Sequence, residues 1–277
     1  MQNLVEVKGL CKQYKNFSLK DVSFSLPDGC ITGFIGVNGA GKTTTLKAML
    51  GLVKIGAGDI QGIDKNRIGI VLDSGSFYDD LTMEQMKSIV APAYSKWSDH
   101  DFEHYMGLFK LDPKQKISTL SKGMRMKYAL ALALSHGAEL LIMDEPTSGL
   151  DPLIRSELLT ILGDYMKNGG RGVFFSTHIT SDLDKVADVL ILIDDGKVIF
   201  QEEKDTLLET HRLVKGDAKL LTPTVKQLFL RTSATEFGFE GVTDRVADVK
   251  AALPDALVEK ATIDDIMLAY IKGGAQG

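Results

Sequence analysis

A glycine-rich loop between an apolar segment and a helical segment is the feature that most constrains this fold. The loop reads GVNGAGKT at 36–43, after an expected strand at 30–35 and before an expected helix at 42–50, which Gly51 ends. Glycines let backbone N–H groups and a helix dipole face phosphates. In this pattern the lysine reaches the terminal phosphates, and the following threonine offers a hydroxyl to Mg²⁺. The sequence therefore predicts an ATP site formed by Gly36, Val37, Asn38, Gly39, Ala40, Gly41, Lys42, Thr43 and Thr44.

A second string, LLIMDEPTSGLD at 140–151, places two carboxylates at the end of an apolar strand expected at 139–144. Open parallel sheets bind ligands at the carboxyl ends of their strands. We therefore expect Asp144 to hold Mg²⁺, together with Thr43, and Glu145 to polarise the attacking water. The alternative is a strand end with ordinary solvated carboxylates, and it does not account for Asp-Glu-Pro following four apolar residues downstream of such a loop.

A third string, LSKGM at 120–124, precedes a helix expected to run to about residue 135. Ser121 is a good helix N-cap, and by itself the string indicates nothing more. A capped helix end with Gly123 close by can also approach an anion. For Lys122, attraction to phosphate and simple solvation both remain open.

The remaining pattern predicts an α/β fold. Further strands are expected at 4–7, 22–26 and 173–176, with a hairpin at 189–201 that turns at Asp195-Gly196. Alternation of strands and helices indicates a mostly parallel sheet with helices on its faces. Residues about 78–135 are expected to form an inserted helical subdomain. Residues 215–277 have weaker periodicity and are expected to be a small α+β accessory domain after a first domain at 1–214, with Thr262 capping its last helix.

Along the chain the strings follow in the order GVNGAGKT, LSKGM and LLIMDEPTSGLD. With this order they resemble the ATP-binding subunits of ABC (ATP-binding cassette) transporters, and the resemblance covers about 1–214. It implies a P-loop NTPase of the ABC ATPase type with an inserted helical subdomain and an N-terminal antiparallel β-subdomain. It also implies that Tyr14 stacks on adenine and that His178 senses the γ-phosphate. Residues that face the nucleotide of a partner subunit would be Ser121, Lys122, Gly123 and the D-loop residue Asp151.

This chain departs from the family pattern at two places. Asp73 occupies the position of a glutamine that contacts magnesium and water, and as a carboxylate it is a candidate metal ligand. The stretch at 59–67 is shorter than expected for the β-subdomain. The Asp73 position, LSKGM and FYDDLT at 77–82 are similar to ATP-binding subunits of bacterial peptide and antibiotic exporters.

The resulting hypothesis is an ATP- and Mg²⁺-dependent motor of an exporter. It would work as a head-to-tail dimer with a second copy or a homologous ATPase subunit, at the cytoplasmic face of the membrane. A separate integral membrane subunit is expected, since no run of about 18 apolar residues is present. Aromatics at 77–105 are expected either to line the groove for that subunit or to pack in the helical core.

Two other classes remain open. One is a soluble ABC ATPase that acts on ribosomes or DNA, and the other is a weakly active ATP-binding regulator, which Asp73 favours. The net charge of −5 gives no general affinity for nucleic acid, so no nucleic-acid partner is expected. Cys11 and Cys30 lack a CxxC spacing and are expected to be unpaired thiols.

Overall fold

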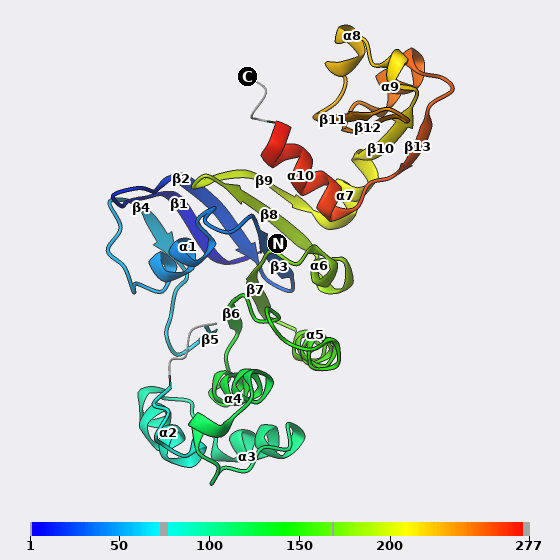
Figure 1. Cartoon of the computed structure of the whole chain (residues 1–277). Coiled ribbons are helices and arrows are strands. Elements are labelled where there is room, and N and C mark those ends of the chain that lie inside the picture. Colours follow the sequence, from blue (N-terminus) through cyan, green and yellow to red (C-terminus); the bar gives the residue numbers. More distant parts are fainter. Residues whose placement is uncertain (1, 73–76, 168, 274–277) are drawn as a thin grey trace.

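The computed structural model describes residues 2–72, 77–167 and 169–273. The chain forms three levels, with a sheet-based core in the middle, a helical subdomain on one side and a C-terminal unit on the other (Figure 1). Among the helices of this described part, none has the length and apolar character needed to cross a membrane.

A six-stranded sheet forms the centre of the molecule. Its strands, in spatial order, are β5 (Ile68–Val71), β6 (Leu140–Asp144), β7 (Gly172–Thr177), β3 (Ile31–Ile35), β8 (Val189–Asp194) and β9 (Lys197–Glu203). The first five are parallel, and β9 pairs antiparallel with β8. Strands β3, β6 and β7 are buried along their whole length, which is why they read as continuous apolar runs. The predicted parallel sheet and the hairpin at Asp195-Gly196 are confirmed.

A three-stranded antiparallel sheet forms the N-terminal β-subdomain, in the order β2–β1–β4. Its strands are β1 (Asn3–Gln13), β2 (Ser18–Pro27) and β4 (Ala57–Gln61). Strand β1 is longer than the predicted segment at 4–7, because its polar residues continue to pair with β2 and β4. Phe24 of this sheet packs against Phe34 and Phe174 of the central sheet, with ring centroids 5.6–5.7 Å from its own. This aromatic cluster joins the two sheets into one core.

Helices cover the central sheet and build the inserted subdomain. Helix α1 (Lys42–Met49) packs in the core shared with the β-subdomain. The helical subdomain contains α2 (Met83–Val90), η1 (Ala91–Ala93), α3 (Asp99–Leu108), η2 (Ile117–Thr119) and α4 (Lys122–Leu134). Helices α5 (Pro152–Met166) and α6 (Thr180–Val186) pack with it in one continuous core. The predicted α/β fold with an inserted helical subdomain is confirmed.

The C-terminal unit, residues 212–273, follows helix α7 (Lys204–Thr210). It has a four-stranded antiparallel sheet, in the order β11 (Arg231–Thr235), β12 (Gly238–Thr243), β10 (Arg212–Gly216) and β13 (Leu257–Lys260). Its helical segments are η3 (Ala218–Leu220), α8 (Pro223–Lys226), α9 (Val246–Ala252) and α10 (Ile263–Gly273). Thr262 and Asp265 form the predicted cap of α10. Strand β10 spans the predicted boundary at 214/215, and α10 buries Ile266 and Met267 in the main core, so the division into 1–214 and 215–277 stays a prediction.

Candidate nucleotide site

The glycine-rich loop connects β3 to α1 and cannot carry side chains at two of its positions. A Cβ on Gly36 would lie 2.3 Å from the carbonyl oxygen of Ile193, and Gly41 precedes α1 with a φ of 118°. Lys42, the first residue of α1, is 6% exposed. Its ammonium lies 2.7 Å from the carbonyl oxygen of Gly36 and 3.3 Å from Glu145 Oε1. The loop therefore holds a buried cation beside its own backbone.

A cavity of about 580 Å³ opens beside this loop, within the size range of small-molecule sites. Its lining comes from four parts of the chain and consists of Asn16, Phe17, Asn38, Gly39, Gly41, Lys42, Thr43, Thr44, Glu145, Ser148 and His178. Of the remaining predicted loop residues, Gly36 and Ala40 are buried and Val37 is exposed. The predicted loop, Glu145 and His178 are thus brought together around one space.

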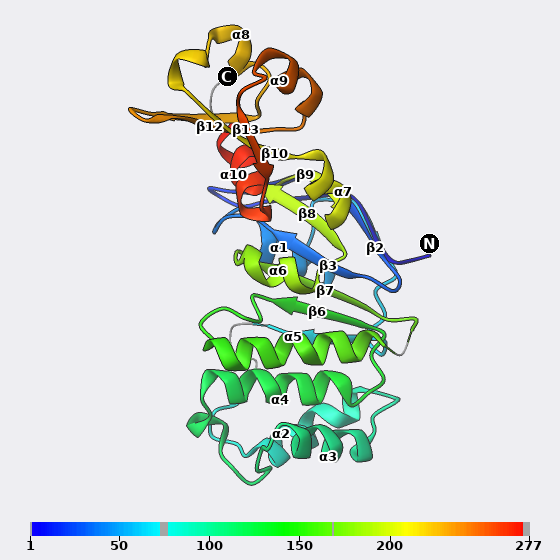
Figure 2. The same ribbon diagram turned by 90° about the vertical axis from the view of Figure 1, so that its right-hand side faces the viewer.

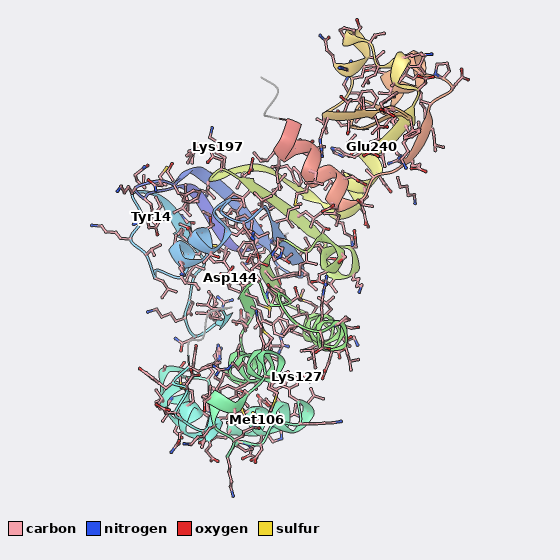
Figure 3. All side chains as sticks on the ribbon, in the orientation of Figure 1. Tyr14, Met106, Lys127, Asp144, Lys197 and Glu240 are labelled. Atoms are coloured by element: carbon pink, nitrogen blue, oxygen red, sulfur yellow. The ribbon has the colours of Figure 1, made fainter. Side chains whose placement is uncertain are left out.

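Asp144 is held at the end of β6 by two hydroxyl groups. The Thr43 hydroxyl donates to Asp144 Oδ2 at 2.8 Å, and the Ser176 hydroxyl of β7 donates to Oδ1 at 2.5 Å. Asp144 is 6% exposed and lies near the middle of the molecule (Figure 3). Adjacent hydroxyl and carboxylate oxygens are hard donors that suit Mg²⁺. The described residues hold no group of three or more His, Cys, Asp or Glu suited to a metal, so an Mg²⁺ ion here would need phosphate and water oxygens as well.

Glu145 is fixed between a cation and an imidazole. His178 Nδ1 lies 2.7 Å from Glu145 Oε2, and because an ionised carboxylate only accepts, the ring nitrogen donates. Glu145 adopts a φ of 49°, and its backbone N–H donates to the carbonyl oxygen of Ser176 at 3.0 Å. A non-glycine residue held in this left-handed region is uncommon and is found disproportionately at functional sites. Glu145 itself lines the cavity beside the loop, together with His178.

The aromatic side chain in the cavity is Phe17 rather than Tyr14. Tyr14 is 41% exposed, and the Lys12 ammonium lies 5.1 Å from its ring centroid. Both aromatics belong to the β1–β2 turn, which is closed by a 2.8 Å hydrogen bond from the Tyr14 N–H to the Phe17 carbonyl oxygen. Neither Phe17 nor Ser176 was predicted from the sequence, although Phe17 lies three residues after Tyr14.

The residues expected to face a partner subunit are absent from the lining of this cavity. Ser121 caps α4 by accepting a hydrogen bond from the Met124 N–H at 3.2 Å, and Asp151 caps α5 in the same way. The Lys122 side chain lies beside Gly149, with its ammonium 3.4 Å from where a Gly149 Cβ would be. Asp73, predicted as a metal ligand, lies outside the described residues.

A second cavity, about 230 Å³, lies between β5 and the helical subdomain and includes Phe77, Tyr94 and Met126 in its lining. Of the other aromatics considered for a docking groove, Tyr78 is 66% exposed. Trp97 packs near Phe102, at a centroid distance of 5.7 Å, and Tyr105 packs on Phe109. Trp97 and Tyr105 are therefore packing residues of the helical subdomain.

Comparison with known proteins agrees with this geometry. Residues 19–148 match the family model described as ABC transporter. The bacitracin transport ATP-binding protein BcrA of Bacillus licheniformis is 31% identical over 225 residues, covering 76% of this chain and 74% of the relative. The lantibiotic transport ATP-binding protein SrtF of Streptococcus pyogenes is 31% identical over 212 residues, covering 73% of this chain and 92% of the relative.

Solved structures give the same assignment. An ATP-binding subunit of an ABC transporter superposes with a TM-score of 0.67 at 28% identity, covering 74% of this chain and 92% of that structure. A dimeric ATP-binding cassette in a post-hydrolysis state, bound to ADP and Pi, superposes with a TM-score of 0.63 at 22% identity, covering 72% and 98%. The fold, the loop and the degree of identity lead to one conclusion: this chain belongs to the ATP-binding subunits of ABC transporters, ATPases whose hydrolysis is coupled to transport.

Proposed function

We propose that this chain is the motor subunit of an exporter of peptides or antibiotics, working at the cytoplasmic face of a membrane. The names of its relatives support this cargo class, since they describe transport of bacitracin and of a lantibiotic. The observation that carries the catalytic part is the position of the Glu145 carboxylate, held between the Lys42 ammonium and the His178 ring at the edge of the cavity.

Glu145 is the proposed general base of ATP hydrolysis. It is 15% exposed and borders the cavity where a γ-phosphate and an attacking water would meet. Its carboxylate would take a proton from the water while the His178 N–H fixes its orientation. Lys42 would exchange its contact with Glu145 for the terminal phosphates, which frees the carboxylate for this role. Mg²⁺ bound by Thr43 and Asp144 would neutralise charge on the β- and γ-phosphates.

ABC ATPases dimerise, and the geometry supports a head-to-tail arrangement for this one. Ser121, Lys122 and Gly123 open α4 outside the lining of the chain's own cavity. The positive end of a helix is a favourable place for an anion. The γ-phosphate bound by a second copy, or by a homologous subunit, is the proposed partner of this helix end, with Asp151 near the contact.

The cavity between β5 and the helical subdomain is the proposed docking groove for an integral membrane subunit. Apolar side chains such as Phe77, Met86 and Met126 line it, and Lys122 and Arg125 add charge at its border. Lys122 also opens α4, so one residue borders both the groove and the helix end assigned to the second copy. Closure of the dimer would therefore move a residue that also borders the groove of the membrane subunit.

The variant Glu145→Gln tests the proposed base, because it keeps the shape but cannot accept the proton. Turnover should fall by about 10² or more, while ATP affinity stays near that of the parent. The isolated subunit and its membrane complex should both be assayed, with the exposed Glu202→Gln as the matched control. Undiminished hydrolysis by Glu145→Gln would rule out this role for the carboxylate.

A further inference from the structure

A buried ion pair joins the two helices that follow the D-loop residue Asp151 and His178. Helix α5 starts directly after Asp151, and α6 starts shortly after His178. On α5, Arg155 Nε donates to Asp182 Oδ1 of α6. The same guanidinium donates through Nη2 to the Ser181 hydroxyl at 2.8 Å. Arg155 therefore hydrogen-bonds to two successive residues of the first turn of α6.

The burial of this pair makes its geometry hard to change. Asp182 is 0% exposed, and the side chain of Arg155 is 26% exposed. The second carboxylate oxygen, Asp182 Oδ2, has no hydrogen-bond partner within the described part of the chain. A buried carboxylate that lost its guanidinium would be left as an uncompensated charge, which proteins strongly disfavour. Helices α5 and α6 should therefore move together rather than separate.

The residue before Arg155 lies against helix α4, whose first turn contains Gly123. A Cβ on Gly123 would lie 3.1 Å from Ile154 Cγ2, and Ile154 is the residue before Arg155. Helices α4 and α5 also lie side by side along their lengths (Figure 2). Gly123 of α4 therefore lies against Ile154 of α5, and the next residue, Arg155, bonds to the first turn of α6. This turn begins next to His178, whose ring is bonded to Glu145.

We propose that Arg155 is a positioning residue that links the two ATP sites of the dimer. The proposal rests on the proposed function, in which α4 faces the partner's nucleotide and Glu145 serves the chain's own nucleotide. ATP in the partner's site would set the position of α4 and α5. Because Arg155 is bonded to α6, a shift of α5 would move α6 and, with it, the His178–Glu145 pair. Hydrolysis in one site therefore depends on nucleotide in the other.

The test compares Arg155→Ala and Arg155→Lys with Arg67→Ala. Arg67 forms an ion pair with Glu139 at the opposite end of the central sheet, so it controls for loss of an arginine–carboxylate contact. Arg155→Ala should lower kcat by about tenfold or more while ATP Kd, measured by equilibrium dialysis, stays within about twofold. Its Hill coefficient for ATP should fall to 1 from a parental value above 1, and Arg155→Lys should recover part of both.

The double variant Arg155→Met, Asp182→Leu guards against misfolding, because it removes both charges and leaves no unpaired carboxylate. It should keep the parental melting temperature and show the same loss of kcat and cooperativity. Parental turnover and parental cooperativity in this folded variant would overturn the proposal, and so would a parental Hill coefficient of 1. A parent that hydrolyses no ATP, or one unaffected by Glu145→Gln, would instead refute the proposed function.

Discussion

The nucleotide cleft and the C-terminal unit differ in whether they bury charged side chains. In the cleft Lys42 and Asp144 are buried, and Glu145 is nearly so. In the C-terminal unit the ion pair of Lys215 with Glu259 is exposed, at 43% and 42%, and apolar side chains form the small core. Burying charge opposes folding unless each charge is paired. The cleft buries charged groups despite this cost, because catalysis needs them preorganised. The C-terminal unit instead buries apolar side chains and leaves its ion pair exposed.

The variant Lys42→Ala, which removes a buried charge of the cleft, should have the largest effect on ATP turnover. It removes the cation from the loop and leaves Glu145 without its ammonium partner. We expect ATP turnover to fall by about 10² or more, with ATP affinity weakened by at least about tenfold, since a charge-assisted contact to phosphate is lost. Lys47→Ala, at the other end of α1, is the control. Tight ATP binding by Lys42→Ala would refute the assignment of the loop.

Local chemistry explains which parts of the structure were predictable. The glycine-rich loop, the β6 strand and the caps Ser121 and Thr262 each depend on residues adjacent in sequence, so the sequence predicted their structure. Strand β4 was missed, because AGDIQ has weak strand propensity and forms by pairing with the distant β1.

The missed site residues share a non-local cause. Ser176 lies inside an apolar strand and becomes a partner of Asp144 only because β6 and β7 pair Asp144 opposite Ser176. Phe17 enters the cavity through the turn that joins β1 to β2 and through its closeness to Gly41. Neither position carries a signal that sequence periodicity can reveal.

Tyr78→Ala should have an intermediate effect and tests the exposed surface next to Phe77 of the docking groove, apart from the cleft. Tyr78 is 66% exposed, so its removal should leave folding nearly unchanged. We expect co-purification with the membrane subunit and transport to fall several-fold, while ATP affinity stays within about twofold. Leu108→Ala, on an exposed face of α3, is the control. Unaltered transport and unaltered co-purification would remove Tyr78 from the docking surface.

Phe239→Ala should have the smallest effect on turnover. Phe239 is 4% exposed and packs edge-on against Phe229 with centroids 5.8 Å apart. Its truncation should destabilise the C-terminal unit by about 3–5 kcal/mol. Hydrogen exchange should show faster exchange in β10 and β12, with ATP turnover changed by less than about twofold if the cleft folds independently of this core. The control is Phe237→Ala, at a side chain that is 96% exposed. A large loss of turnover in Phe239→Ala would make the C-terminal unit part of the catalytic assembly.

The most direct test of the head-to-tail ATPase combines two inactive subunits in one dimer. Ser121→Arg blocks the helix end that would face the partner's γ-phosphate, and Lys42→Ala disables the loop. In a dimer of one subunit of each kind, purified through two different tags, both lesions fall in the same composite site and the other site stays intact. We expect less than half the parental rate, because the intact site has no nucleotide in the site coupled to it. The head-to-tail model nevertheless predicts that the mixed dimer hydrolyses ATP measurably, while both variant homodimers are inactive. A mixed dimer no more active than the homodimers would contradict it.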